Sequence, residues 1–483
     1  MLSIVLGMSP TAEQLSEALR SKDGKLPDIF RILVDAKGSQ DSAQTWLTAA
    51  KVALSKDEPE RCKSILETFR ESNPIDITAM LLLSKACQRL GSVDDLDESV
   101  MLARKAVGSA SSPEDALRAA VQLAVSLGTR ARVHTRQQVD RHQDRDEAIQ
   151  VLFALDALAA AAAKPGATGT GGRTGSDSCS PDVAHGLYVL ALLQAEQGGS
   201  HAVAAGATAL AAWQAAQAAK EPQLTALSLV LMSTILSSRQ GHKAALACLS
   251  KYSASTTAAG AAERPLWTEV LVCRLRARLL AALGDAAAGM EALAQAKKLL
   301  GSWLEGRSGG ALPPGVSRAM AEEALAKVWG ELAVAMAISG QRAEALAAAD
   351  QALALRPWTA ASRHALGQVY EALAQYDDAG AAYDDALALD PTHAATLLRK
   401  GALHLRRGTG PDLAVARDLL AEALTYDPRS AAGWQELGRV AGSLEHRQQA
   451  EEHMLMAVRL ASEAPALEFG ELPLAPPAAG TGL

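Results

Sequence analysis

The stretch GQVYEALAQYDDAGAAYDDALALDP, residues 367–391, decides the fold class of this chain. Its six acidic residues and three tyrosines could form an acidic site, or they could belong to a repeated structural unit. The residues around them recur at a fixed distance: Ala345 and Ala379 stand 34 residues apart, as do Pro357 and Pro391. A fixed period of this length is typical of an array of helical hairpins. The spacing therefore favours a repeated structural unit.

The residue types within the period match the tetratricopeptide repeat (TPR) pattern of Gly, Tyr, Ala, Tyr or Phe, Ala and Pro. One copy precedes the quoted stretch from Trp329, and two follow it, from Gly401 and from Trp434. Each copy predicts two helices with small residues where they cross and, in the first three copies, a proline that ends the second helix. The residues predicted to pack in this way are Trp329, Leu332, Ala345, Pro357, Leu366, Gly367, Tyr370, Ala379, Tyr383, Ala386, Pro391, Gly401, Ala423, Pro428, Trp434, Leu437, Gly438, Ala450 and Ala457.

Composition agrees with an all-α protein. Of the 483 residues 49% are hydrophobic but only 4% are aromatic, and alanine makes up the difference. Alanine favours helix and lets helices pack closely. A single hairpin cannot bury its apolar face, so the repeats are expected to stack lengthwise into an α-solenoid, a superhelix of TPR hairpins.

Upstream of the clear repeats the pattern weakens, but residues 79–107, 185–216 and 269–300 each predict two helices around a short turn. Two Gly-rich stretches predict surface loops between the repeat blocks. The expected organisation is degenerate repeats over 1–163, a Gly/Ser-rich loop over 164–182, degenerate repeats over 183–300, a Gly/Pro-rich loop over 301–317, four clear repeats over 318–463 and a largely disordered tail over 464–483.

Several classes of function find no support. The net charge of -7 is spread along the chain, which argues against nucleic acid as a partner. The five cysteines form no CxxC pair, and no nucleotide, metal-protease or nucleophile motif is present. The sequence therefore predicts a non-enzymatic cytoplasmic protein with no cofactor and no metal, touching membranes only peripherally through partners.

Residues 266–284 carry one candidate binding motif. Trp267 and Leu280 could serve as apolar anchors around Arg274, Arg276 and Arg278, as in helices that calmodulin binds. The alternative is that this stretch is the first helix of a repeat, with its apolar face buried. In the clear repeats, Tyr370, Arg399, Arg406 and Trp434 are candidate groove residues, although Tyr370 and Trp434 also occupy packing positions.

Four segments resemble one family, the calmodulin-binding TPR proteins of plants named for the no-pollen-germination phenotype, together with the animal tetratricopeptide repeat protein seven group. They are residues 79–107, 135–158, 185–197 and 458–473. The resemblance implies a non-catalytic scaffold, with calmodulin binding in the plant branch. In the animal branch it implies support of the plasma-membrane phosphatidylinositol 4-kinase complex. Family members carry further repeats before the point matched by residues 1–21, so the N-terminus is expected to be shortened.

The resulting hypothesis is a TPR scaffold that binds protein partners and is recruited to the inner face of the plasma membrane with a phosphatidylinositol 4-kinase complex. A general TPR assembly factor or adaptor unrelated to lipid kinases is the alternative. The aspartates of residues 367–391 fall between the packing positions and are expected to lie at the surface.

Overall fold

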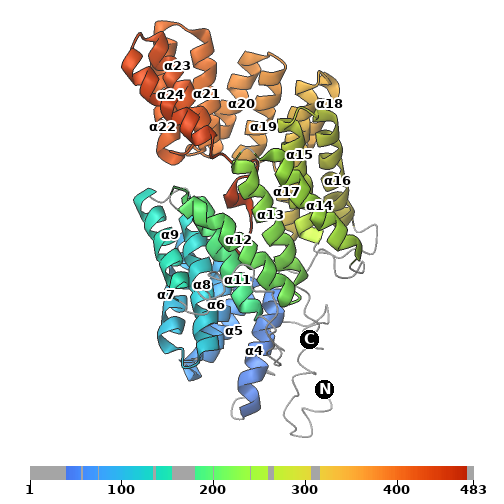
Figure 1. The fold of residues 1–483 in the computed structure, drawn as a ribbon, viewed down its shortest axis with the longest axis vertical. Helices are drawn as coiled ribbons and strands as arrows, with labels where there is room; N and C mark the ends of the chain where they lie inside the picture. Colours follow the sequence, from blue (N-terminus) through green and yellow to red (C-terminus); the bar gives the residue numbers. More distant parts are fainter. Residues whose placement is uncertain are drawn as a thin grey trace, which may run out of the picture. The chain divides into compact units, whose positions relative to one another are not determined.

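The computed structural model describes residues 40–55, 58–73, 75–133, 138–154, 180–199, 201–239, 241–258, 266–305 and 316–475 (Figure 1). Throughout these ranges the regular structure is helical and no strand occurs, so the predicted all-α class is confirmed. Residues 1–39, most of the predicted loops (164–179 and 306–315) and the last residues, 476–483, lie outside the described residues.

The chain divides into two compact units. Unit 1 consists of residues Met1–Val133, Val139–Leu224 and Pro473–Leu483, and unit 2 consists of His134–Gln138 and Thr225–Leu472. The boundary at residue 224 differs from the three blocks expected from the sequence, because it falls inside a helix and not in a Gly-rich loop.

Unit 1 is built from helix pairs joined by short turns. The predicted hairpin over 79–107 forms α6 and α7, and the one over 185–216 forms α11 and α12. The helices of this unit are α4 (Gln40–Ser55), α5 (Pro59–Ser72), α6 (Ile77–Leu90), α7 (Val93–Ser109), α8 (Pro113–Ala131), α9 (Gln138–Phe153), α11 (Pro181–Gln197) and α12 (His201–Ala218).

Unit 2 continues the same construction, and each of the four clear repeats forms one hairpin, from α17/α18 to α23/α24. Its elements are α13 (Pro222–Ser238), which starts in unit 1, α14 (His242–Ala258), α15 (Leu266–Ala282), α16 (Ala286–Glu305), α17 (Arg318–Ile338), α18 (Arg342–Leu355), α19 (Ala360–Ala372), α20 (Tyr376–Leu389), α21 (Ala394–Arg407), α22 (Gly410–Tyr426), α23 (Ala431–Ser443), α24 (Arg447–Ala461) and the 3-10 helix η2 (Phe469–Glu471).

Local sequence explains where these helices start and stop. Serine side chains cap α7, α8 and α11 by accepting a hydrogen bond from a backbone N–H of the first turn. At the other end, α18, α20 and α22 each stop two residues before a proline, at Pro357, Pro391 and Pro428. The residue before a proline disfavours the helical conformation, so these prolines set the length of each hairpin.

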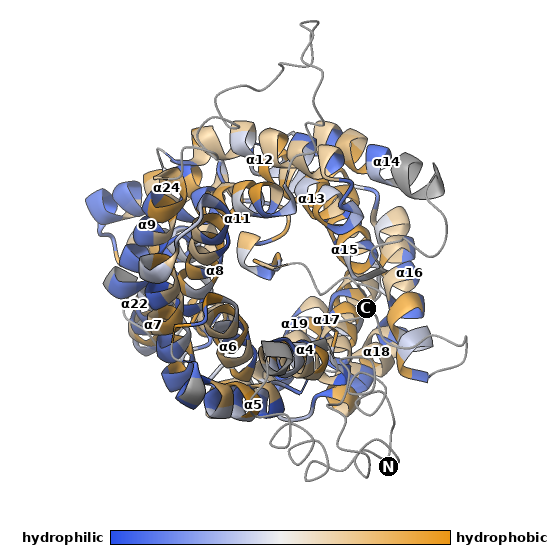
Figure 2. Cartoon of the chain, turned by 90° about the horizontal axis from the view of Figure 1, so that it is seen from below, coloured by the Kyte–Doolittle hydropathy of each residue, from blue (hydrophilic) through white to orange (hydrophobic). Residues whose placement is uncertain are grey.

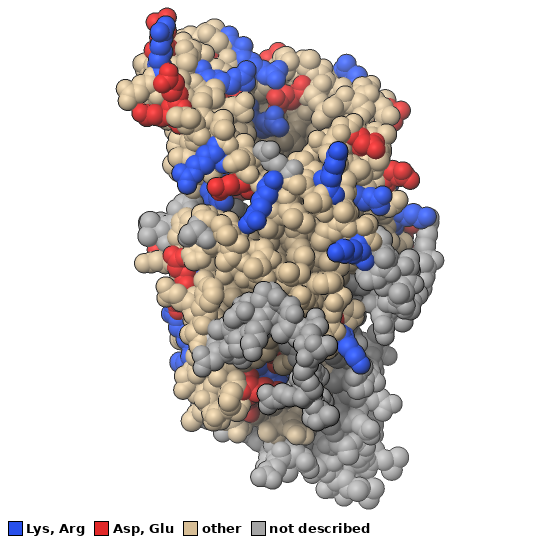
Figure 3. All heavy atoms as spheres, in the orientation of Figure 1, with Lys and Arg blue, Asp and Glu red and all other residues tan. Residues whose placement is uncertain are grey.

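Small residues dominate the core, as Ala345, Ala379, Ala386 and Ala423 are all at most 3% exposed. In Figure 2, α12 and α13 are mostly hydrophobic in colour, whereas α9 is mostly hydrophilic. No helix among the described residues combines the length and the apolar character that a membrane crossing requires. On the face shown in Figure 3, the Lys and Arg side chains of the described residues stand apart among uncharged ones and form no continuous basic stripe.

Residues 464–475, here called the C-terminal segment, are folded, unlike the disordered tail expected from their Pro- and Gly-rich composition. Leu467 and Leu472 are fully buried and Leu474 is 5% exposed. A single 3-10 turn, η2, lies between Glu468 and Leu472, whose backbone is extended. Burial of these leucines offsets the entropy that ordering the segment costs.

Candidate functional site

The predicted packing glycines lie where a neighbouring side chain leaves no room for a larger residue. A Cβ atom added at Gly367 would stand 2.3 Å from Cε1 of Tyr383, and one added at Gly401 would stand 2.8 Å from Cγ of Leu420. At Gly438 the nearest atom is Cγ of Met454, 3.1 Å away. The three positions therefore allow the two helices of one hairpin to approach each other closely.

The larger packing residues of the repeats are buried or half-buried. Leu332 is buried, whereas Trp329, Leu366, Tyr370 and Leu437 are half-buried and pack against the hydrophobic clusters of unit 2. Trp434 is half-buried, and its indole N–H donates a hydrogen bond of 2.9 Å to the carbonyl of Pro428. Ala450 is half-buried and Ala457 is buried.

The acidic residues of the quoted stretch make ion pairs across helices. Asp377 and Asp385 on α20 pair with Arg407 at 3.1 Å and with Arg363 at 3.4 Å. Asp384 pairs with Lys400. The side chain of Asp377 is 98% exposed, and that of Asp385 is 62% exposed. Such exposed pairs contribute little to stability, and they leave no group of carboxylates that faces a common centre.

Both candidate groove arginines pair with a carboxylate within the repeats. The guanidinium groups of Arg399 and Arg406 lie 3.6 and 3.9 Å from Oε1 of Glu371. Arg406 also covers the ring of Tyr376, with 5.1 Å between its Cζ and the ring centroid. The hydroxyl of Tyr383 donates to the other oxygen of Glu371 at 3.0 Å. These contacts hold the arginines in place between neighbouring hairpins.

The calmodulin-binding candidates lie on α15, the first helix of the α15/α16 hairpin. Arg276 is exposed, whereas Arg274 is buried and Arg278 is half-buried. Trp267 packs against the hydrophobic cluster formed with α16 and α17, and Leu280 is half-buried. The five residues therefore do not share one accessible face, and the helix has the buried apolar side expected of a repeat.

Arg274 and Arg278, here called the α15 arginine pair, form the centre of an ion cluster with two glutamates. Oε1 of Glu331, on α17, lies 2.6 Å from a nitrogen of each arginine. Glu471, on η2, lies 2.6 Å from Arg274 and 3.2 Å from Arg278. Three segments distant in sequence meet at this cluster.

Charge attraction governs the protonation of this cluster. Burial alone would raise the pKa of Glu331, but the positive charges of the α15 arginine pair hold that pKa below its usual value. Burial alone would lower the pKa of Arg274, but the charges of Glu331 and Glu471 outweigh it and raise that pKa. Glu331 and Arg274 are therefore both ionised at neutral pH.

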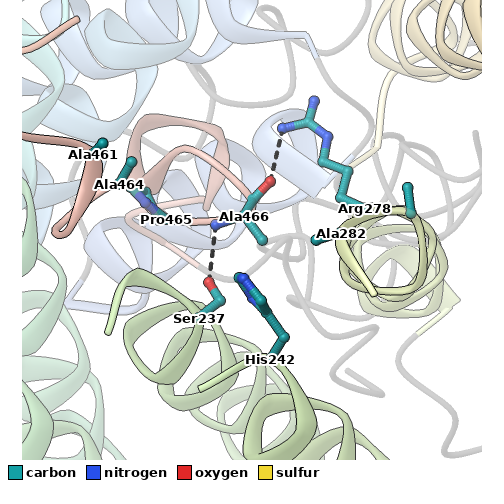
Figure 4. Close-up of a pocket in the computed structure, with 9 residues that line it drawn as sticks. Ser237, His242, Arg278, Ala282, Ala461, Ala464, Pro465 and Ala466 are labelled. Carbon is teal, nitrogen blue, oxygen red and sulfur yellow. Dashed lines mark hydrogen bonds between the residues drawn. The ribbon is translucent and has the colours of Figure 1, made fainter. Parts of the chain in front are cut away.

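The main chain of the C-terminal segment is bound a few residues before Glu471. The N–H of Ala466 donates to Oγ of Ser237, on α13, at 2.9 Å, and Arg278 donates to the carbonyl of Ala466 at 3.3 Å (Figure 4). A cavity of about 550 Å³ adjoins these contacts. Its lining residues are Ser237, His242, Arg278, Ala281, Ala282, Ala461, Ala464, Pro465 and Ala466.

Within unit 1 the continuation of the segment is held in the same manner. The hydroxyl of Tyr188 donates to the carbonyl of Pro473 at 2.8 Å, and Nε2 of His185 lies 3.0 Å from the carbonyl of Leu474. The side chain of Leu474 lies against Gly128, where an added Cβ would come within 3.0 Å of it. Burial lowers the pKa of His185, so its ring is neutral and its N–H donates to that carbonyl.

A second cluster of ionisable residues, in unit 1, contains Cys87, Asp95 and Glu98. Their ligand atoms lie within 4.8 Å of one another, but Nζ of Lys63 already binds Asp95 at 2.7 Å and Glu98 at 2.8 Å. Burial and the neighbouring Glu98 raise the pKa of the Cys87 thiol to about 12. A protonated thiol and a lysine ammonium do not suit a metal ion, so we interpret this group as an ion-pair cluster.

Sequence reasoning missed the binding of the C-terminal segment, although a signal was present. Leu467, Phe469, Leu472 and Leu474 recur along the segment, and apolar residues at this density are unusual in a disordered tail. The partners of the segment lie on α13 and α15, about 190 to 230 residues away, and no local pattern reveals them.

Comparison with known proteins identifies the repeat. A family model described as Tetratricopeptide repeat matches residues 360–393, the α19/α20 hairpin. No curated protein sequence matches the chain. A crystal structure of Ypp1 superposes with a TM-score of 0.51 at 12% identity, covering 95% of this chain and 60% of Ypp1. The likeness to Ypp1 therefore shows the fold alone.

Two other solved structures match the chain with lower TM-scores. Yeast Tom70 has a TM-score of 0.37 at 13% identity, covering 94% of this chain and 95% of its own. MamA has a TM-score of 0.26 at 14% identity, covering 38% of this chain and 91% of its own. Both TM-scores are below 0.5, so neither likeness supports a conclusion about this chain.

Proposed function

Since the chain is an all-α TPR repeat protein, we propose that it is a non-catalytic scaffold that binds other proteins through unit 2. The observation that supports this most is the way unit 2 holds residues 466–471. Its side chains bind a backbone N–H, a backbone carbonyl and one carboxylate of a segment whose regular structure is the single 3-10 turn η2. A surface that binds these groups suits a peptide segment of another protein.

The partner we propose is a phosphatidylinositol 4-kinase complex at the inner face of the plasma membrane. This part of the proposal rests on the resemblance of residues 79–107, 135–158, 185–197 and 458–473 to the tetratricopeptide repeat protein seven group. Such a scaffold would touch the membrane only through its partners.

Affinity purification of the full chain, with identification of the retained proteins by mass spectrometry, tests this proposal. We expect the catalytic subunit of a phosphatidylinositol 4-kinase among them, and a fall in plasma-membrane phosphatidylinositol 4-phosphate when the gene is deleted. If the chain retains other proteins and the lipid level stays unchanged, the chain is a general TPR adaptor. Failure to retain any protein reproducibly would contradict both forms of the proposal.

Calmodulin is the less favoured partner. To bind residues 266–284, calmodulin would have to remove Trp267 from its hydrophobic cluster. It would also have to break the ion pairs of the α15 arginine pair with Glu331 and Glu471. A synthetic peptide of residues 266–284 and the folded chain can be compared for calcium-dependent calmodulin binding. We expect the peptide to bind more tightly than the chain. Equal calcium-dependent binding by both would restore calmodulin as a partner of the folded protein.

A further inference from the structure

Residues 464–472 resemble a bound peptide more than a repeat element. They follow the last helix, α24, and they form no hairpin with it. Ala464, Glu468 and Gly470 are exposed, whereas Leu467 and Leu472 are fully buried. One side of the segment therefore faces unit 2 and the other faces solvent, as in a peptide lying on a surface.

The contacts at Ala466 do not depend on the identity of its side chain. Oγ of Ser237 accepts a hydrogen bond from the N–H, and Arg278 donates to the carbonyl (Figure 4). Both groups belong to the main chain, which every segment of similar conformation presents. Specificity must then come from the side chains that flank this residue.

The strongest such side chain is Glu471. The α15 arginine pair binds both of its oxygens, and Arg274 is only 7% exposed. Glu331 pairs with the same two arginines and balances part of their charge. Without Glu471 the cluster would hold two positive charges and one negative charge, so the site has a net attraction for one further carboxylate.

With the C-terminal segment in place, the cavity beside Ala466 is still empty. His242 lines this cavity, and its Nδ1 is a buried atom for which the described part of the chain provides no hydrogen-bond partner. Ala281, Ala282 and Ala464 give the remaining walls a small, apolar character. A ligand with a side chain longer than alanine at this position could fill the cavity and bond to His242.

We infer that Ser237, His242 and the α15 arginine pair form a peptide-binding site in unit 2 that residues 464–472 of the same chain occupy. The fitting partner is a protein segment that can form a 3-10 turn like η2, with a leucine at the position of Leu467 and an acidic residue at the position of Glu471. A side chain larger than alanine at the position of Ala466 would improve the fit. This inference rests on the proposed scaffold function, and it means that a partner must displace the C-terminal segment.

The test uses the full chain with a protease site inserted between Glu463 and Ala464, and a fluorescent peptide of residues 464–475. Before cleavage the tethered segment competes at a high effective concentration, so we expect peptide binding to be at least tenfold weaker than after cleavage. The peptide variant Glu471→Lys should bind at least tenfold more weakly to the cleaved chain. The matched peptide Glu468→Gln, altered at an exposed position, should retain its affinity.

Every outcome bears on the inference. Peptide exchange in the cleaved chain, with helical circular dichroism unchanged, supports a replaceable ligand. If the cleaved segment does not exchange, or if cleavage unfolds the helices of unit 2, the segment is a fixed part of the core and the inference is wrong.

Hydrogen exchange on the uncut chain gives a second measurement. In the Glu471→Lys variant, the amides of residues 464–475 should exchange faster than in the wild type, and those of α19–α22 should exchange at the wild-type rate. If the exchange rates of the two regions rise equally, the inference is wrong.

These results can be separated from those on the proposed function. The peptide measurements use purified components, so they can succeed whether or not a lipid kinase is retained from cells. If a kinase subunit is retained while the peptide does not exchange, the scaffold function stands and only this site is rejected.

Discussion

Gly367 lies so close to the ring of Tyr383 that hydrogen is its only tolerated side chain. We predict that Gly367→Ala lowers the free energy of unfolding by about 1–3 kcal/mol, because the added methyl group forces Tyr383 to move. Gly380→Ala is the matched control, since no atom lies within 4 Å of its Cβ position. That change should raise stability by about 0.5–1 kcal/mol, as alanine favours helix over glycine.

Urea unfolding followed by circular dichroism measures both variants. Adding Tyr383→Leu to Gly367→Ala should restore part of the loss, since a smaller side chain then faces the methyl group. If Gly367→Ala and Gly380→Ala unfold at the same urea concentration, Tyr383 does not restrict the side chain at position 367.

His364 is the residue from which we expect a pH effect. Burial, with a smaller contribution from His393 and Arg399, lowers the pKa of His364 to about 3. Its Nδ1 lies 3.0 Å from Oγ1 of Thr396, and its ring contacts Tyr383. The folded state therefore keeps this imidazole neutral while the unfolded chain, with a pKa near 6.5, takes up a proton below that pH.

Because the unfolded state binds more protons between the two pKa values, stability falls as the pH drops below about 6.5. From pH 7 to pH 5 we predict that His364 removes about 1–2 kcal/mol from the free energy of unfolding. Urea unfolding of the wild type and of His364→Gln at both pH values tests this, and the variant should show the smaller loss. An identical loss in both proteins would contradict the prediction.

The turns inside the hairpins share one unusual backbone residue. In five of the turns that the structure describes, the second residue after the first helix has a positive φ: Gly199 at 56°, Gly284 at 88°, Gly340 at 80°, Ala374 at 60° and Glu445 at 63°. This left-handed conformation costs roughly 1 kcal/mol for a residue that has a Cβ atom, and it costs glycine nothing. The turns at Ala374 and Glu445 therefore carry strain that the three turns with glycine avoid.

We predict that Ala374→Gly raises the free energy of unfolding by up to about 1 kcal/mol, and that Gly340→Ala lowers it by a similar amount. The two substitutions exchange the same residues at equivalent positions, so each serves as the control for the other. Thermal unfolding is a suitable measurement. If the melting temperature rises in both variants or falls in both, the prediction is wrong.

At the level of the elements, features that depend on neighbouring residues could be predicted from the sequence, whereas contacts between distant residues could not. The prolines at 357, 391 and 428 correctly indicated where second helices end, because the restriction they impose is local. The arginines of α15 suggested a calmodulin site, but Arg274 faces Glu331, 57 residues away. The sequence around α15 gives no sign of that partner, and so it could not separate a buried ion pair from an exposed basic face.

At the scale of the whole molecule, the two units have hydrophobic clusters of their own. The cluster from Trp46 to Leu102 belongs to unit 1, whereas those around Leu332 and Tyr383 belong to unit 2. Composition did not predict the boundary, since it falls within α13 and a Gly- or Pro-rich linker does not mark it. Contacts between residues distant in sequence decide where the units divide.

We predict that the two units respond separately to destabilisation, as stacked repeats with separate cores should. In hydrogen exchange, Gly367→Ala should increase the exchange rates of α19 and α20 and leave those of α6 and α7 in unit 1 unchanged. Gly380→Ala again serves as the control. An equal increase in both units would show that they open together.

The contact between Glu471 and the α15 arginine pair also has a consequence for synthesis. Glu471 leaves the ribosome 140 residues after Glu331, when every α-helix described in unit 2 has already been made. Since chains fold from the N-terminus as they are made, Arg274 and Arg278 have only Glu331 as a partner during that interval. The nascent protein thus presents its peptide-binding site open, and a partner present during translation meets no competing segment.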